Sequence, residues 1–209
     1  MSDVQDKVVL ITGAGNGLGQ AFCRAFTAAG ANVAANDLTD INLFPLAEEA
    51  RREGGEMKIF TNDISKKLAL QQTISEVLEA WGRIDILVNH ASVQPHHALL
   101  EMDEWDWRRT VDVILTGTFL MTQSVGRVMK ELGGGAILNV GPAPGDTPRA
   151  AYLAAKAGVL AFTAAAAEEL SPFNILVNAV IPASGDLAAA AKAGLELCSG
   201  GSSGEIRAC

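Results

Sequence analysis

A glycine-rich turn between an apolar run and a helical pattern constrains the fold of this chain more than any other feature. The turn reads Thr12-Gly13-Ala14-Gly15-Asn16-Gly17-Leu18-Gly19; an apolar run, residues 8–11, precedes it and a helical pattern follows from residue 20. Glycines let a phosphate approach the backbone closely, and the N–H groups and dipole at a helix start attract its charge. The pattern therefore predicts a strand, a turn and a helix around a bound nucleotide.

The spacing of the glycines distinguishes this turn from the fingerprint G-x-G-x-x-G. Leu18 stands where that fingerprint needs its third glycine after Gly13 and Gly15, and the spacing that fits is T-G-x-x-x-G-x-G. A flexible turn is the alternative interpretation, because the chain has 21 glycines among 209 residues. The residues that follow the turn decide between the two.

A carboxylate lies at the position where a dinucleotide site needs one. A second apolar run, residues 32–36, ends at Asp37, which follows the glycines by about 20 residues and can accept hydrogen bonds from the ribose of an adenosine. Asp37 would repel a 2′-phosphate, and Asn16 stands where a basic residue could have bound one. The sequence therefore predicts NAD as the cofactor rather than NADP.

Composition excludes several other partners. The net charge is −8 and the calculated pI is near 4.9, whereas nucleic acids and anionic membranes recruit basic surfaces. The first residues have no apolar targeting core, and no charge-free run reaches the roughly 18 residues of a membrane span. We expect a cytoplasmic protein that acts on small molecules. Three widely spaced cysteines, Cys23, Cys198 and Cys209, fit packing residues or free thiols better than a disulfide or metal framework.

Short β-branched runs alternate with longer helical patterns along the whole chain. This alternation predicts a single α/β domain, 1–209, with a Rossmann-type, doubly wound parallel sheet flanked by helices. The expected strands are residues 8–11, 32–36, 57–60, 84–89, 136–140, 175–181 and 205–208. The expected helices are residues 18–29, 43–53, 66–81, 103–132, 150–170 and 187–198.

Ligands of such sheets bind beyond the carboxyl ends of the strands, so the residues after each strand are candidate site residues. Asp63 and Ile64 follow the third strand and are placed to seat an adenine. Asn89-His90-Ala91-Ser92 follows the fourth strand. Asn89 has two roles that are equally open and compatible with each other: direct contact with the cofactor, and a side-chain hydrogen bond that holds the end of the strand.

Tyr152 and Lys156 form the candidate catalytic pair. A spacing of four residues in a helical stretch brings the phenol and the ammonium to one face, where the positive charge stabilises a phenolate and makes tyrosine a usable general acid and base. A solvated helix face would explain the pair equally well if it stood alone. However, Tyr152 is the only tyrosine in the chain and it follows the fifth strand, on the side where ligands bind.

These residues resemble the short-chain dehydrogenase/reductase family, whose pattern combines T-G-x-x-x-G-x-G, N-N-A-G after the fourth strand and Y-x-x-x-K on a later helix. The resemblance covers nearly the whole chain. It implies NAD(P)-dependent interconversion of alcohols and ketones, with Tyr152 as general acid and base, Lys156 beside it and on the nicotinamide ribose, and a homodimer or homotetramer that pairs through helices 103–132 and 150–170. The cofactor-binding residues that it implies are Gly13, Asn16, Gly17, Leu18, Gly19, Asp37, Asp63, Ile64, Asn89, Ala91, Tyr152, Lys156 and Pro182.

The chain also departs from the family pattern around the expected substrate. Gly141 and Pro142 stand where the family has its catalytic serine, and the loop from there to Tyr152 is about three residues short. Ile114 replaces an asparagine of the long helix, and the chain passes from residues 185–186 directly into a helix where the family inserts a segment that covers the substrate. Loss of one donor to a developing oxyanion typically costs about 10²–10³ in rate, so we expect reduced activity.

Several alternatives remain open from the sequence. A replacement donor could come from Thr147, Ser92, His90, His96 or His97, whereas a metal site formed by the adjacent histidines and Asp103 is not expected, because neighbouring side chains in a loop diverge. A catalytically inactive NAD-binding scaffold of the same fold is the rival function. A trimmed chain would also explain the missing substrate-covering segment.

Overall fold

Seven parallel strands form the centre of the protein. The computed structural model describes residues 4–143, 145, 149–182 and 185–209. The strands are β1 (Val8–Thr12), β2 (Asn32–Asp37), β3 (Glu56–Thr61), β4 (Ile86–Asn89), β5 (Gly135–Val140), β6 (Ile175–Ile181) and β7 (Ile206–Ala208). Their order in the sheet is β3-β2-β1-β4-β5-β6-β7, and every neighbouring pair is parallel. This order reverses between β1 and β4, which is where ligands of doubly wound folds bind.

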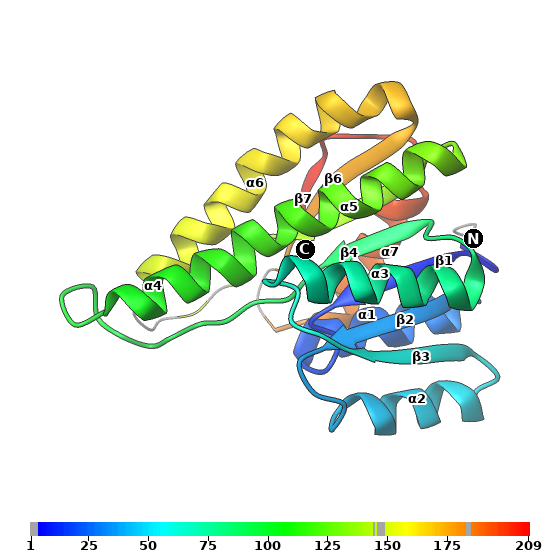
Figure 1. The fold of residues 1–209 in the computed structure, drawn as a ribbon, viewed down its shortest axis with the longest axis horizontal. Helices are drawn as coiled ribbons and strands as arrows, with labels where there is room; N and C mark the ends of the chain where they lie inside the picture. The colour runs from blue at the N-terminus through cyan, green and yellow to red at the C-terminus, as the bar shows by residue number, and fades with distance from the viewer. Residues whose placement is uncertain (1–3, 144, 146–148, 183–184) are drawn as a thin grey trace.

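Helices cover both faces of this sheet (Figure 1). They are α1 (Gly17–Ala28), α2 (Leu43–Arg52), α3 (Lys67–Trp81), α4 (Glu104–Val111), α5 (Gly117–Leu132), α6 (Ala150–Leu170) and α7 (Leu187–Ser199), with a π-helical turn η1 (Asp112–Thr116) and a 3₁₀ turn η2 (Ser171–Phe173). The apolar side chains of α1, α2 and α7 fill one core, and those of α3, α5 and α6 fill the other. The expected Rossmann-type α/β fold is therefore confirmed.

Alternation along the strands explains why two cores form. In β1, Val9 and Ile11 belong to the core under α1 and α7, whereas Val8 and Leu10 belong to the core under α3 and α5. Successive side chains of a strand point to opposite faces, so a continuous apolar run is what a strand covered on both sides requires. Cys23 and Cys198 pack in the first core as free thiols, and burial raises the pKa of each to about 12.

Most expected segments differ from the observed ones by one or two residues at an end. β4 begins at Ile86 and β7 at Ile206, two residues and one residue later than predicted. The helix predicted over residues 103–132 is one continuous path of three segments, because the π-helical turn η1 separates α4 from α5. The buried side chain of Ile114 lies within this turn. The position of the family's missing asparagine therefore still carries a wide helical turn.

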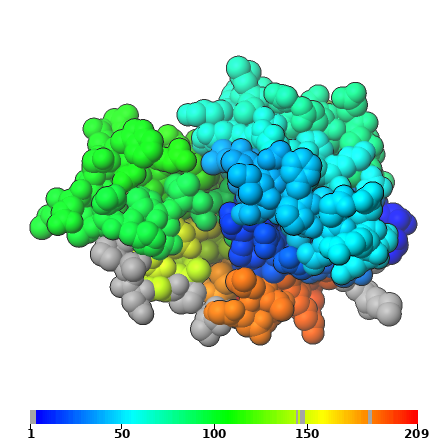
Figure 2. Space-filling model, turned by 90° about the horizontal axis from the view of Figure 1, so that it is seen from below, coloured from blue at the N-terminus to red at the C-terminus, as the bar shows by residue number. Residues whose placement is uncertain are grey.

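The carboxyl ends of the strands meet on one side of the molecule. In Figure 1 the arrowheads of β2 and β3 point to the left, toward the loop that leads into α4. In the view from below, the green segment around α4 projects beside the blue N-terminal part of the chain (Figure 2). The glycine turn, the segment after β4 and the start of α6 all lie at this edge, because each follows a strand of the same parallel sheet.

One helical segment, residues 150–173, is long and apolar enough to cross a membrane by length and composition alone, with a mean hydropathy of 1.5. In this fold α6 packs against the sheet instead, and its residues Thr163, Ala166 and Ala167 are buried. The core helix of an α/β domain meets the same test of composition.

Candidate active site

The glycine turn after β1 lies against the segment that follows β4. Gly13 has a φ of +66°, and a Cβ on it would lie 2.6 Å from the Cα of Ala91, so only glycine fits there without strain. The backbone N–H of Ala14 donates to the carbonyl of Asn36, which fixes the turn to the end of β2. The backbone itself therefore forms the floor of the cleft at this edge of the sheet.

The turn leads directly into α1. The helix begins at Gly17, and the N–H of Gly19 donates to the carbonyl of Asn16. The side chain of Leu18 is buried in the core, so this residue has only its backbone to offer a ligand. The side chain of Asn16 accepts a hydrogen bond from Asn42 at 3.0 Å, on the wall of the cleft.

Asp37 lies at the carboxyl end of β2, where the sequence predicts the ribose carboxylate. Its Oδ2 accepts a hydrogen bond of 2.8 Å from the N–H of Gly15, and its Oδ1 accepts one of 2.7 Å from Leu38. A Cβ on Gly15 would lie 2.8 Å from the same Oδ2. The missing side chain at position 15 therefore makes room for the carboxylate that the sequence places opposite it.

A cleft joins these elements. Its lining comes from the ends of β1 to β4 and from α4 and η1: Gly13, Asn16, Asn36, Asp37, Leu38, Asn62, Asp63, Ile64, His90, Ala91, Ser92, Val93, Arg109 and Val113. Asp63 also accepts hydrogen bonds from the backbone and the hydroxyl of Ser65, so its carboxylate is fixed in the wall. Six of the thirteen predicted cofactor residues thus border one cleft, namely Gly13, Asn16, Asp37, Asp63, Ile64 and Ala91.

Asn89 fills the structural role that the sequence left open. Its Nδ2 donates to Oδ1 of Asn139 at 2.9 Å and to the hydroxyl of Thr122 at 3.2 Å, and its side chain is buried. Asn139 continues the network to Thr163 of α6 at 2.9 Å. These bonds tie β4, β5, α5 and α6 together beneath the cleft.

His90, which stands at the second asparagine of N-N-A-G, bridges two turns. Its Nδ1 lies 2.9 Å from the carbonyl oxygen of Gly13, and a carbonyl can only accept, so this nitrogen carries a proton. Burial lowers the pKa of His90 to about 4, with a further contribution from the charge of Lys156, so the ring is neutral near neutral pH. The hydroxyl of Thr12 accepts hydrogen bonds from the backbone N–H groups of His90 and Ala91, both at 3.2 Å.

Tyr152 and Lys156 are both buried near the start of α6. The ring of Tyr152 packs against Ile114 of η1 and against Ala155 and Val159 of its own helix. Nζ of Lys156 donates to the carbonyl of Val140 at 2.7 Å and lies 6.0 Å from the centre of the Tyr152 ring. Burial lowers the pKa of Lys156 to about 7. The predicted pair therefore faces the end of β5 and not solvent.

The loop after β5 provides a contact that the sequence does not reveal. The backbone N–H of Ala143 donates to Oη of Tyr152 at 3.0 Å. The guanidinium of Arg149 donates to the carbonyls of Ala143 and Gly145, each at 2.7 Å, and lies 5.6 Å from the centre of the Tyr152 ring. No sequence signal identifies these residues, because backbone donors leave no pattern and an arginine in a loop has many uses.

Other donors that the sequence suggested are distributed unevenly. Ser92 and His90 border the cleft, whereas Thr147 lies outside the described residues. His97 contacts the carboxylate of Asp106 at 3.2 Å, and Asp103 caps α4 by accepting from the N–H of Asp106. Within the described ranges no group of three or more histidine, cysteine or acidic residues is arranged to hold a metal ion.

Pro182 directly follows β6, at the same edge as the cleft. A few residues further on, Asp186 caps α7 by accepting from the N–H of Ala189 at 2.9 Å, and the helix begins at Leu187. Only a short connection therefore links β6 to α7.

Comparison with known proteins identifies relatives over most of the chain. The family model of short chain dehydrogenases matches residues 7–195. A 3-oxoacyl-[acyl-carrier-protein] reductase of Thermotoga maritima is 37% identical over 185 residues, which are 86% of this chain and 74% of the relative. A D-threitol dehydrogenase of Mycolicibacterium smegmatis is 36% identical, over 84% of this chain and 69% of the relative.

Solved structures resemble the fold closely. A short chain dehydrogenase from Mycobacterium smegmatis has a TM-score of 0.91 at 27% identity, covering 100% of this chain and 93% of that chain. A short-chain type dehydrogenase/reductase from Mycobacterium marinum has a TM-score of 0.93 at 26% identity, covering 99% and 94% of the two chains. The similarity therefore extends over the whole described fold, including the edge that carries the cleft.

Proposed function

The chain belongs to the short-chain dehydrogenase family, and from this premise we propose that it is an NAD-dependent oxidoreductase that interconverts a secondary alcohol and a ketone at a reduced rate. The observation that carries the proposal is the position of Tyr152 and Lys156, buried at the end of β5 on the sheet edge that also holds the glycine turn. A solvated helix face, which was the alternative explanation of the pair, would leave both side chains exposed. The catalytic roles of both residues are part of the proposal.

The residues of the cleft fit a dinucleotide. Gly13 and Gly15 leave space that a Cβ would fill, and α1 begins with backbone N–H groups at the same turn. The carboxylate of Asp37 would hold the adenosine ribose, and its charge supports NAD over NADP. The turn that would bind the phosphates consists of Asn16, Gly17, Leu18 and Gly19. The rest of the cofactor site would be bordered by Asp63, Ile64, Asn89, Ala91 and Pro182. When bound, the nicotinamide would supply or accept the hydride.

Proton transfer is then the task of the protein. We propose that the phenolic O–H of Tyr152 exchanges a proton with the substrate oxygen, because a backbone N–H lies beside its Oη and can stabilise the tyrosinate. Lys156 would stabilise the tyrosinate by its charge, and its lowered pKa of about 7 means that the ammonium form dominates only below that pH in the free protein. The missing serine at position 142 removes a donor to the substrate oxygen, which supports a reduced rate.

Turnover separates this proposal from the rival scaffold. A panel of ketones and aldehydes is incubated with NADH, and oxidation of NADH is followed for the wild type and for Tyr152→Phe. We expect slow oxidation by the wild type with at least one compound and loss of that signal in Tyr152→Phe. Binding of NADH by both proteins without any turnover would favour the inactive scaffold.

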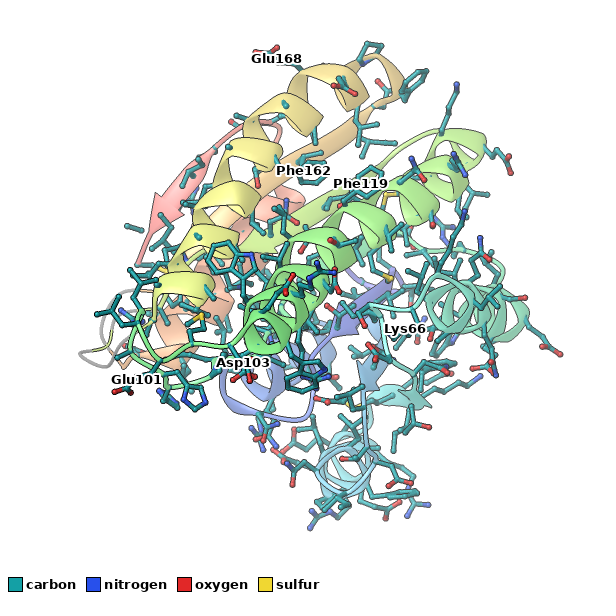
Figure 3. The ribbon with its side chains drawn as sticks, turned by 60° about the vertical axis from the view of Figure 1, so that its left-hand side comes forward. Lys66, Glu101, Asp103, Phe119, Phe162 and Glu168 are labelled. Atoms are coloured by element: carbon teal, nitrogen blue, oxygen red, sulfur yellow. The ribbon has the colours of Figure 1, made fainter. Side chains whose placement is uncertain are left out.

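We also propose that two copies pair through α5 and α6. Phe119 and Phe162 face each other from these helices, with ring centres 6.3 Å apart at 82° (Figure 3). Phe119 is 41% exposed, and the groove around both rings is mostly apolar, which is what an interface core requires. The rival explanation is that the small residues of α6 serve only its packing on the sheet. Sedimentation should give a dimer or tetramer at micromolar concentration, and a monomer for Phe119→Asp.

A cytoplasmic location remains part of the proposal, and fractionation of the producing cells would test it.

A further inference from the structure

The position of the missing serine raises the question of what stabilises Oη of Tyr152 in this chain. In the described part of the loop, Gly141 and Pro142 carry no hydroxyl, and Pro142 has no N–H. The next residue, Ala143, donates its backbone N–H to Oη of Tyr152 at 3.0 Å. The side chain of Tyr152 is 5% exposed, so water cannot easily provide the same bond.

We propose that the backbone N–H of Ala143 replaces the absent hydroxyl as the hydrogen-bond donor to Tyr152, and that Arg149 is the positioning residue that holds this amide in place. The inference rests on the proposed function, because it concerns the same proton-transfer site. It assigns to a loop amide a task that no side chain of residues 141–143 can perform.

Arg149 holds the loop by two carbonyls that follow this amide in the chain. Its Nη1 donates to the carbonyl of Ala143 and its Nη2 to the carbonyl of Gly145, both at 2.7 Å. A planar guanidinium can bind two carbonyls at once in a fixed geometry, which a lysine ammonium cannot reproduce. The guanidinium also lies 5.6 Å from the centre of the Tyr152 ring, so its positive charge adds to the effect of the amide on a tyrosinate.

The chemistry explains why this donor matters. In the reduction of a ketone, a bound nicotinamide would supply hydride to the carbonyl carbon, and the electron pair of the C=O bond would remain on the substrate oxygen. The O–H bond of Tyr152 then breaks, its proton passes to that oxygen, and the tyrosinate keeps the electron pair. The N–H of Ala143 binds this new charge, and bonds to a charged acceptor are about twice as strong as neutral ones.

The contact differs from that of a serine in one respect. A serine hydroxyl can turn its one O–H toward the substrate oxygen and accept a hydrogen bond from Tyr152, whereas the N–H of Ala143 can only donate and is directed at Oη of Tyr152. The amide therefore stabilises the tyrosinate and leaves the substrate oxygen without its second donor. Tyr152 can therefore still transfer its proton, and the substrate oxygen lacks a second donor, which is the reason for the reduced rate in the proposed function.

The experiment uses the single tyrosine of the chain as its own reporter. Because Tyr152 is the only tyrosine, the ultraviolet absorbance of tyrosinate during a pH titration reports this residue alone. Ala143→Pro removes the N–H donor, and we expect the titration midpoint to rise by about one pH unit or more, the equivalent of one bond to a charged group. Ala143→Gly keeps the N–H, so its midpoint should lie nearer to that of the wild type.

Arg149→Gln tests the positioning role and does not depend on whether Ala143→Pro folds. Arg149→Gln should raise the titration midpoint as well. The midpoint of Arg149→Lys should return less than half of the way to the wild-type value, since one ammonium cannot hold both carbonyls. The matched control is Arg51→Gln, which removes an exposed guanidinium paired with Glu48 and should leave the midpoint unchanged.

Turnover gives the second readout. If the proposed function is correct, Ala143→Pro should lower kcat by about 10- to 1,000-fold, the usual loss for one donor, with little change in NADH affinity. Midpoints that stay at the wild-type value in folded Ala143→Pro and Arg149→Gln would overturn the inference, whatever the turnover. A raised midpoint in a protein that turns over no substrate would support the contact and contradict the proposed function, so the two failures are distinguishable.

Discussion

The turn after β1 and the loop after β5 both bring backbone groups to the same edge of the sheet, but they are held there by different means. Backbone hydrogen bonds to β2 and within the turn fix the first, and close contact with Ala91 admits only glycine at position 13. The second is held largely by one side chain, Arg149, and by one bond to Tyr152. The half of the site that we propose binds the cofactor is therefore held mainly by main-chain geometry, with side-chain contacts from Asp37 and His90, whereas the proposed catalytic half depends on a few replaceable side chains.

This difference predicts how each half responds to substitution. A side-chain change in the catalytic half should alter the rate and leave cofactor binding intact, because the glycine turn does not depend on it. A change at Asp37 should alter cofactor binding and leave the rate with the preferred cofactor nearly unchanged. Substitutions that affect both halves equally would contradict the comparison.

The largest effect is expected from Tyr152→Phe. This substitution removes only the phenolic oxygen, and general acid–base catalysis typically contributes about 10²–10⁴ in rate. We expect kcat to fall by that factor and the dissociation constant of NADH, measured by fluorescence titration, to remain close to that of the wild type. A wild-type rate that survives the substitution would refute the catalytic assignment.

Pro142→Ser should produce an effect in the opposite direction. Position 142 is half-buried, whereas a Cβ at position 141 would lie 2.9 Å from Cγ1 of Ile181, so a serine is better accommodated at 142. The new hydroxyl supplies a second donor to the substrate oxygen, and we expect kcat to rise by about 10- to 1,000-fold.

The control for Pro142→Ser is the double variant Pro142→Ser/Tyr152→Phe, which should lose the gain. If Pro142→Ser leaves the rate unchanged while Tyr152→Phe abolishes it, the new serine does not act as the missing donor. Either the short loop holds its hydroxyl out of reach, or that donor does not limit the rate, and Tyr152 keeps its assignment in both cases.

The cofactor half is tested at Asp37. Removal of this carboxylate, together with Leu38→Arg beside it, should remove the repulsion of a 2′-phosphate and add a charge that binds it. We expect the preference for NADH over NADPH to decrease by about 10- to 100-fold, as one charge-assisted hydrogen bond is worth roughly that factor. Equal affinity of the wild type for the two cofactors would contradict the assignment, and kcat with the preferred cofactor should change little.

The sequence predicted the geometry of the glycine turn better than that of the loop after β5, for a physical reason. The glycine spacing and Asp37 are local signals, because a turn that needs a positive φ or a close approach demands glycine and leaves a pattern. The central strands β1 and β4 were predictable because continuous apolar runs are what a doubly covered strand requires, whereas β3 and β7 lie at the edges of the sheet and carry exposed residues. The role of Asn89 was left open until its bonds to Asn139 and Thr122 were known, because both partners are far away in the sequence.

The catalytic half combines parts that no local pattern joins. Ala143 acts through a backbone N–H, which is present in almost every residue, and Arg149 contributes through the positions of two carbonyls. The π-helical turn η1 was also not predicted, because residues 103–132 were interpreted as one continuous helix and the π-turn lies inside it. The absent serine, by contrast, could be read directly from Gly141 and Pro142.

The smallest expected effect concerns stability, and it shows what the buried pair costs the fold. Burial lowers the pKa of Lys156 from the ordinary 10.5 to about 7, so between these two values the unfolded chain binds a proton that the folded protein does not. Stability must then rise with pH across this window, and below about pH 7 the full penalty of the buried ammonium is present.

Lys156→Met removes the charge, so it should raise Tm by a few degrees near pH 7 and have little effect near pH 10. Lys66→Met, at an exposed lysine at the start of α3 (Figure 3), is the matched control and should show no such pH dependence. Thermal unfolding of the cofactor-free proteins across this pH range measures the difference. A Lys156→Met variant that is less stable than the wild type at every pH would mean that the hydrogen bond to Val140 outweighs the cost of burial, and the catalytic half would then be stabilised by its lysine.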